Sequence, residues 1–211
     1  MLFMREIFSK YRWEIFNLLI LILICLIIKC YGYNQLLFIK INSYHYLLQD
    51  NIWMMINLLA YSKYSILLLL LLILTYKYKK QEMLRVIILC ISYFLVFYLL
   101  KKIFNEPRPY IVLPKDSFHF IPYFENYINS SYLSFPSGHV GQVAIFIFAI
   151  LNLFRVNFLL KLFLFAFLFL VCAARICSGW HWPVDVVASI LVAYILNIII
   201  FGVNKRVNLN G

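Results

Sequence analysis

The chain has 211 residues, of which 65% are hydrophobic and only 13% are charged, and its mean hydropathy is +0.90. This composition excludes an ordinary soluble domain, where about half of the residues are apolar, and predicts a polytopic membrane protein with a single domain, residues 1–211. The formal charge of +11 falls mostly at the borders of apolar runs, which argues against a nucleic-acid partner. The five cysteines have neither zinc-ligand spacing nor an obvious disulfide framework.

Apolar runs dominate the chain, and several reach the roughly 20 residues that an α-helix needs to cross a bilayer. No small-residue cleavage site follows the first run, so we interpret it as an uncleaved helix and not a signal peptide. The mixed polar and aromatic residues of 33–61 favour a loop with an interfacial helix. The predicted fold class is therefore all-α, a bundle of six transmembrane helices at about 15–28, 58–76, 86–100, 140–154, 158–173 and 186–201.

The distribution of positive charge predicts how this bundle is oriented. With six spans, the N-terminus, the turns after spans two and four, and the C-terminus share one side, and together they hold most of the Lys and Arg residues. The positive-inside rule therefore places both termini in the cytoplasm. Three short polar segments then fall together on the extracytoplasmic face, where we expect the functional site.

The first polar segment contains two cations, Lys101 and Arg108, followed by Pro109. A spacing of seven residues would put both cations on one helix face if the helix continued that far. Two fixed cations can hold a phosphoryl group, and Arg can do so with two hydrogen bonds. Taken alone, the pattern is more typical of a helix end that is anchored to lipid headgroups.

The second polar segment is Pro136-Ser137-Gly138-His139, immediately before an apolar run. We expect Ser137 to be the helix N-cap and Gly138 to let the backbone approach a ligand closely. The free N–H groups at such a helix start can bind an anion, and His139 can donate a proton to a leaving oxygen. An ordinary helix cap beside an interfacial histidine is the alternative.

The third polar segment holds Arg175, His181 and Asp185. The four-residue spacing lets the carboxylate of Asp185 hold the His181 ring and fix its tautomer, which makes the imidazole a good nucleophile or base. We expect Arg175 to reach the same anion; a purely structural His–Asp pair is the alternative. Because the sequence contains no cluster of carboxylates or of Cys and His with metal-ligand spacing, no metal or other cofactor is expected.

Together, these three segments within 101–185 resemble the signature motifs of the type-2 phosphatidate phosphatase (PAP2) superfamily: Lys-x6-Arg-Pro, Pro-Ser-Gly-His and Arg-x5-His-x3-Asp. The resemblance implies that His181 attacks phosphorus, that Asp185 orients it and that His139 protonates the leaving group. It also implies which residues hold the phosphoryl oxygens: Lys101, Arg108, Ser137, Gly138 and Arg175. The one departure is Ala174, where the family usually has Ser, and it removes a hydroxyl donor.

The implied activity is that of a metal-independent lipid phosphatase of a bacterial cytoplasmic (inner) membrane, which forms a phosphohistidine. The expected partners are the bilayer and a lipid phosphate or diphosphate: phosphatidate, phosphatidylglycerophosphate, undecaprenyl diphosphate or a lipid A phosphate. No obligatory protein partner is expected. Substrate selectivity would come from 33–61 and 115–133, where Asp116 and His119 either contact a headgroup or are ordinary polar loop residues.

Two other functions remain open from the sequence. Vanadate-dependent haloperoxidases resemble this family in their motifs, but they are soluble, unlike a chain with six apolar spans. A membrane protein that only binds or flips phosphorylated lipids would tolerate the loss of His181 or Asp185, and both are present.

Overall fold

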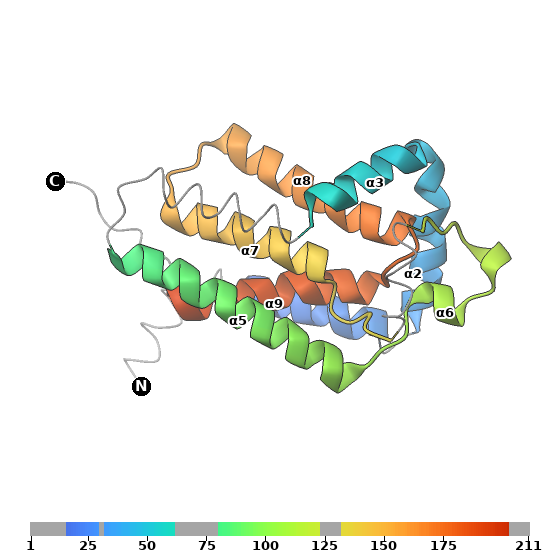
Figure 1. Cartoon of the computed structure of the whole chain (residues 1–211), viewed down its shortest axis with the longest axis horizontal. Helices are drawn as coiled ribbons and strands as arrows, with labels where there is room; N and C mark the ends of the chain where they lie inside the picture. Colours follow the sequence, from blue (N-terminus) through green and yellow to red (C-terminus); the bar gives the residue numbers. More distant parts are fainter. Residues whose placement is uncertain (1–15, 30–31, 62–79, 123–131, 203–211) are drawn as a thin grey trace.

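The computed structural model describes residues 16–29, 32–61, 80–122 and 132–202 (Figure 1). All regular secondary structure in these ranges is helical, which confirms the all-α prediction for them. The helices are Phe16–Lys29, α2 (Tyr33–Asn42), η1 (Ser43–Leu47), α3 (Asp50–Leu59), α5 (Lys80–Phe104), α6 (Pro109–Val112), η2 (Lys115–Ser117), α7 (Gly138–Leu153), α8 (Phe158–Cys177) and α9 (Pro183–Phe201).

Three helical stretches of the described residues are long and apolar enough to cross a membrane: Gln81–Val112, which includes α5 and α6, then α8 and α9. The bent pair Phe16–Lys29 and Tyr33–Leu47 makes a fourth if it counts as one span, and α7 is apolar but shorter. The predicted span at 58–76 lies mostly outside the described residues. The helices therefore indicate a membrane protein, and the number of six spans stays a prediction.

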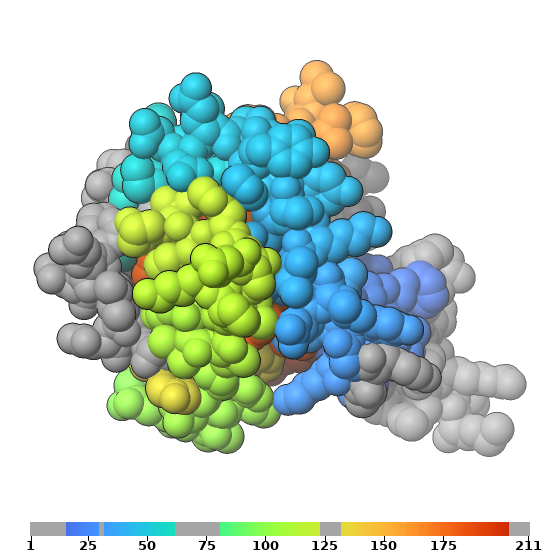
Figure 2. Space-filling view, turned by 90° about the vertical axis from the view of Figure 1, so that its right-hand side faces the viewer, coloured from blue at the N-terminus to red at the C-terminus, as the bar shows by residue number. Residues whose placement is uncertain are grey.

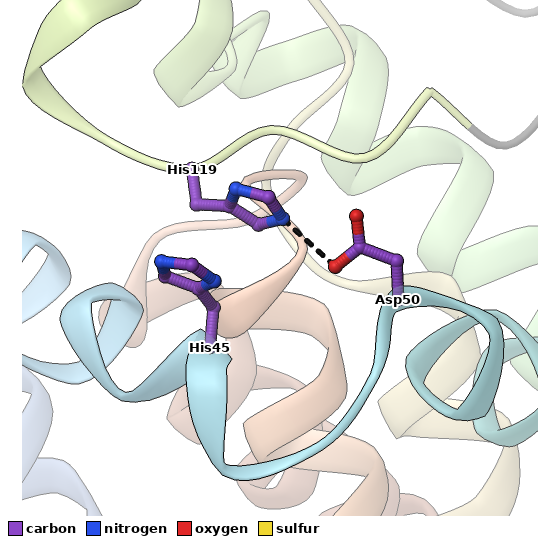
Figure 3. Close-up of side chains that lie close together, drawn as sticks. All are labelled: His45, Asp50 and His119. Atoms are coloured by element: carbon purple, nitrogen blue, oxygen red, sulfur yellow. Dashed lines mark hydrogen bonds and ion pairs between the residues drawn. The ribbon is translucent and has the colours of Figure 1, made fainter.

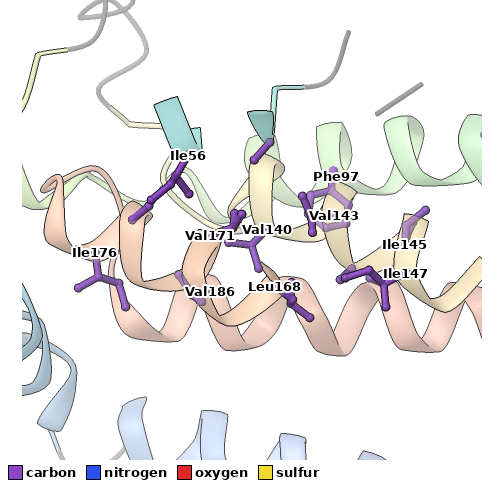
Figure 4. Packing of buried hydrophobic residues seen from close by; sticks show 14 of the residues in the cluster. Ile56, Phe97, Val140, Val143, Ile145, Ile147, Leu168, Val171, Ile176 and Val186 are labelled. Atoms are coloured by element: carbon purple, nitrogen blue, oxygen red, sulfur yellow. The ribbon is translucent and has the colours of Figure 1, made fainter. Parts of the chain in front are cut away.

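The core of the bundle lies where α7 packs along α9, with α5 and α8 beside them (Figure 4). Val140, Ala144 and Ile147 of α7 are completely buried, at the i, i+4 and i+7 spacing that lines one helix face. Gly141 lets α5 approach α7 closely, because a Cβ atom there would lie 2.1 Å from the Phe97 ring. The helices are thus held by close packing of small and branched side chains.

The outer faces of α5 and α8 are also apolar. Large hydrophobic side chains such as Ile91, Phe163 and Phe169 are more than half exposed. A soluble protein rarely exposes so large an apolar surface, whereas a helix that is apolar on all sides is typical of a membrane span. The exposed faces therefore fit contact with lipid.

One end of the bundle is covered by α2, η1 and α3 together with the segment that contains α6 and η2 (Figure 2). Residues 33–61, predicted as a loop with an interfacial helix, are thus mostly helical. The buried side chain of Asn42 fixes this cover: it donates to the carbonyls of His119 (2.9 Å), Ile176 (3.0 Å) and Cys177 (3.0 Å), and it accepts from the His119 amide (2.7 Å). One side chain therefore ties α2 to the end of α8.

Candidate active site

The three polar segments singled out in the sequence meet at the covered end of the bundle. The first follows the end of α5, the second begins α7, and the third connects α8 to α9. His181 and Asp185 are almost completely buried, with exposed fractions of 2% and 1%. Backbone also joins the second and third segments, since the Ser137 amide donates to the Asp185 carbonyl at 3.3 Å.

Asp185 lies in the first turn of α9, which begins at Pro183, a residue that suits the first helical position. Its Oδ2 atom lies 3.3 Å from Nδ1 of His181, and it accepts hydrogen bonds from the Ser134 hydroxyl (2.6 Å) and the Trp182 amide (3.0 Å). A buried carboxylate with several donors is fixed in position. Asp185 is therefore a rigid support for the imidazole.

The other ring nitrogen of His181 faces a cation. Nη1 of Arg108 lies 3.1 Å from Nε2 of His181 and also donates to the Trp180 carbonyl at 3.0 Å. Because a guanidinium has only donors, Nε2 must offer its lone pair, and the ring proton must lie on Nδ1, where it donates to Asp185. Burial, together with the positive charges of Arg108, Arg175 and Lys101 and the nearby His139, lowers the pKa of His181 well below its usual value. The ring is thus a neutral imidazole whose Nε2 lone pair accepts from Arg108.

Lys101 and Arg108 converge through a turn and not on one continuous helix face. The helix α5 ends at Phe104, and Asn105 turns the chain with a φ of 43°, a left-handed conformation that Asn tolerates better than most residues. Both cations then donate to the Leu133 carbonyl, at 2.7 Å from Lys101 and 3.4 Å from Arg108. The two predicted phosphate ligands therefore share one acceptor, although the local geometry differs from the helical prediction.

Arg175 approaches the site from the last turn of α8 and is 4% exposed. It donates to Oδ1 of Asn57 on α3 at 2.7 Å. The Trp180 ring lies near both guanidinium groups, 5.4 Å from Arg108 and 5.7 Å from Arg175, which are cation–π distances. Trp180 thus helps to hold two like charges in one buried region.

Ser137 is the N-cap residue of α7, as predicted, but its hydroxyl makes no capping hydrogen bond. That hydroxyl is buried and has no hydrogen-bond partner among the described residues. A Cβ atom at Gly138 would meet nothing closer than the Tyr93 hydroxyl, at 3.8 Å. The start of this helix thus has an unused donor and a glycine whose Cβ position would be in ordinary contact with Tyr93, beside the half-buried His139.

Several residues that build the site were not predicted. Ser134 and the Leu133 carbonyl lie just before the second motif, but no sequence pattern distinguishes them. Asn57 stands 118 residues before the arginine that it contacts, and its own neighbours in sequence are apolar. Ala174, the departure from the motif, is completely buried in the core.

Comparisons with known proteins identify the family of this chain. The chain is 31% identical over 160 residues to undecaprenyl-diphosphatase BcrC of Bacillus subtilis (strain 168). The aligned region covers 75% of this chain and 77% of that protein. The crystal structure of Aquifex aeolicus LpxE matches with a TM-score of 0.66 and 26% identity, over 79% of this chain and 93% of that one. The profile of the PAP2 superfamily matches residues 81–208, a range that contains all three motifs. The chain therefore belongs to the PAP2 superfamily.

Proposed function

We propose that this protein is a membrane lipid phosphatase that hydrolyses a terminal phosphate through a phosphohistidine at His181. The observation that carries the proposal is the pair of contacts on the imidazole, with Asp185 at Nδ1 (3.3 Å) and Arg108 at Nε2 (3.1 Å). The similarity to an undecaprenyl-diphosphatase makes undecaprenyl diphosphate the first substrate to test. Phosphatidate, phosphatidylglycerophosphate and lipid A phosphates are the others.

Substrate binding would exchange protein acceptors for phosphoryl oxygens. Lys101 and Arg108 both donate to the Leu133 carbonyl, and a phosphate carries more negative charge and accepts stronger hydrogen bonds than a neutral carbonyl. The unused Ser137 hydroxyl, the Gly138 amide and Arg175 would complete the set of donors. A helix start with free N–H groups also favours an anion.

In the first chemical step, the Nε2 lone pair of His181 attacks phosphorus while the bond from phosphorus to the leaving oxygen breaks. His139 gives its proton to that oxygen, and Asp185 stabilises the positive charge that develops on the ring of His181. In the second step, His139 takes a proton from water, and the oxygen of that water displaces His181 from phosphorus. The products are the dephosphorylated lipid and inorganic phosphate, with both histidines restored and no metal used.

We also propose that the site faces outward from a bacterial cytoplasmic membrane, with six spans and both termini inside. The charge distribution supports this orientation. Reporter fusions that are active only in the cytoplasm, placed after the C-terminus and within 115–121, would test it. The reporter after the C-terminus should be active, and the reporter within 115–121 should be inactive. The reverse pattern would overturn the orientation.

The activity is tested by phosphate release from the four lipid classes by the purified protein in detergent, with and without EDTA. We expect release that persists in EDTA and that falls at least about 10³-fold in His181→Ala and His139→Ala. Asp185→Asn should also lower phosphate release. Asp116→Asn, which changes an exposed acid of η2, is its matched control. Near wild-type release from His181→Ala would overturn the proposal, and a protein that binds these lipids without releasing phosphate would be a binding protein instead. Bromide oxidation with added vanadate checks the haloperoxidase alternative.

A further inference from the structure

A second cluster of histidine and carboxylate side chains lies apart from the candidate active site, in the cover of the bundle. It consists of His45 in η1, Asp50 at the start of α3, and His119 in the segment after η2 (Figure 3). Nε2 of His119 lies 2.9 Å from Oδ1 of Asp50, and the rings of His45 and His119 stack with centroids 3.8 Å apart and an angle of 11°. One potential ligand atom from each residue lies within 4.8 Å of the others.

The donor set of this cluster is that of a transition-metal site. Two imidazoles and one carboxylate suit Zn²⁺, Co²⁺, Ni²⁺ or Cu²⁺, whereas Mg²⁺ and Ca²⁺ prefer oxygen ligands alone. Tetrahedral Zn²⁺, with bonds of about 2.0–2.2 Å, holds neighbouring ligand atoms roughly 3.4 Å apart. The widest separation, 4.8 Å, therefore has to shrink by at most about 1.4 Å, and the stacked rings have to rotate so that their lone pairs converge on the ion. The side chains of His119 and Asp50 are 29% and 52% exposed, which leaves room for this rotation and for a water as fourth ligand.

The backbone around the cluster is fixed, so only side chains have to move. Both the amide and the carbonyl of His119 are bonded to the buried Asn42. The carbonyl of His45 accepts from the Trp53 side chain of α3 at 2.8 Å. Two regions of the chain, His45–Asp50 and the segment of His119, lie 69 residues apart in sequence from Asp50 to His119 and are thus already held close together. Less conformational freedom is then lost when an ion binds.

We propose that His45, Asp50 and His119 form a binding site for one first-row transition-metal ion, with Zn²⁺ as the best fit. The ion takes no part in the phosphoryl chemistry. It joins η1, α3 and the segment of His119, and so locks the cover of the bundle.

The cover contacts the candidate active site at two points, so a metal ion bound in the cover can affect the positions of active-site residues. The helix α3 carries Asn57, which accepts from Arg175 at 2.7 Å. Two residues after His119, the Ile121 carbonyl accepts from the Trp180 side chain at 2.8 Å. Metal binding should therefore stabilise the positions of Arg175 and Trp180; this consequence, unlike the metal site itself, rests on the proposed function.

The site is tested by metal binding to the full chain, purified in detergent through a tag without histidine and freed of metal with a chelator. Zn²⁺ titration calorimetry should show one ion per chain, and Co²⁺ should give the visible absorption of a tetrahedral site with nitrogen and oxygen ligands. The variants His45→Phe and His119→Phe keep the ring stack and the backbone hydrogen bonds but remove a ligand, and Asp50→Asn keeps a polar side chain. Each should weaken Zn²⁺ binding by about 100-fold.

Two controls separate this site from the rest of the chain. Asp116→Asn, in the same segment, should bind Zn²⁺ like the wild type, and so should His181→Ala. Absence of binding in the wild type, equal affinity in His119→Phe, or a Co²⁺ spectrum with thiolate charge transfer from the cysteines would each overturn the assignment.

A final readout distinguishes the metal site from the proposed function. Zn²⁺ should raise the unfolding temperature of the wild type and of the inactive His181→Ala, but not that of His119→Phe. If phosphatase activity is absent while this shift is present, the proposed function fails and the metal site stands. If activity is present while the shift and the binding are absent, the metal site fails alone.

Discussion

Ser134 offers the sharpest test of how the proposed nucleophile is held. Its side chain is completely buried, and its hydroxyl donates to Oδ2 of Asp185 at 2.6 Å. A hydrogen bond to a charged group contributes about 1.5–3 kcal/mol. If the carboxylate needs this bond to keep its position against His181 in the transition state, Ser134→Ala should lower kcat about 10- to 100-fold.

The assay is phosphate release from a lipid phosphate by detergent-purified protein, with thermal unfolding measured on the same samples. Because Ser134 has no proposed contact with the phosphate, KM should change little. The control Ser117→Ala removes an exposed hydroxyl that bonds only the local Pro114 carbonyl, and it should leave kcat unchanged.

A double variant decides whether Ser134 acts through His181. In a His181→Ala background, Ser134→Ala should cause no further loss, because residues that act as one unit are not additive. An unchanged kcat in a folded Ser134→Ala protein, or an equal loss in both backgrounds, would refute the reasoning.

Three further predictions address charge, pH and packing. Lys101→Ala should lower kcat/KM at least tenfold, whereas the neighbouring exposed Lys102→Ala should have little effect; equal losses would indicate a general surface-charge effect. Burial and the nearby cations lower the pKa of His181, so its neutral, nucleophilic form should remain the main form at acidic pH. The midpoint of the fall in kcat/KM on the acid side should therefore lie below pH 6.5. A midpoint at or above pH 6.5 would contradict this. Gly141→Ala should lower the free energy of unfolding by about 1–3 kcal/mol, and with it the unfolding temperature, because its Cβ would meet the Phe97 ring at 2.1 Å. Phe97→Leu should restore part of the loss, and no rescue would mean that the clash lies elsewhere.

The sequence predicted helices well where they are apolar, and less well where they end in polar residues. The run predicted at 158–173 corresponds to α8, which begins at Phe158 but continues to Cys177. The run predicted at 86–100 is only the middle of α5, which reaches from Lys80 to Phe104. A prediction from hydropathy ends the helix where Lys, Glu and Gln begin, although these residues are good helix formers. The helices of 33–61 were underestimated because their Asn, Ser, His and Tyr residues favour helices only weakly.

The sequence predicted which polar segments meet at the candidate site, but not the residues that support them. Motif spacing predicted the contact between Asp185 and His181, although His181 precedes α9 and the turn before Pro183 brings the two side chains together. Contacts such as Asn57 to Arg175 join residues 118 positions apart, and no local pattern encodes them. The Ser134 hydroxyl was missed because one serine in a polar loop resembles any other.

The charge around His181 supports the proposal that this arrangement binds a phosphate. In the described part of the site, three cations, Lys101, Arg108 and Arg175, surround the single carboxylate of Asp185, and both arginines and the carboxylate are buried. Burying charges is costly, and among these four side chains one negative charge, on Asp185, stands against three positive ones. A phosphate monoester dianion would offset the other two and would bring acceptors for the Ser137 hydroxyl and for both cations now bonded to the Leu133 carbonyl. Burial, together with the same positive charges, lowers the pKa of His181, so under the proposed function these cations would both bind the dianion and favour the neutral nucleophile.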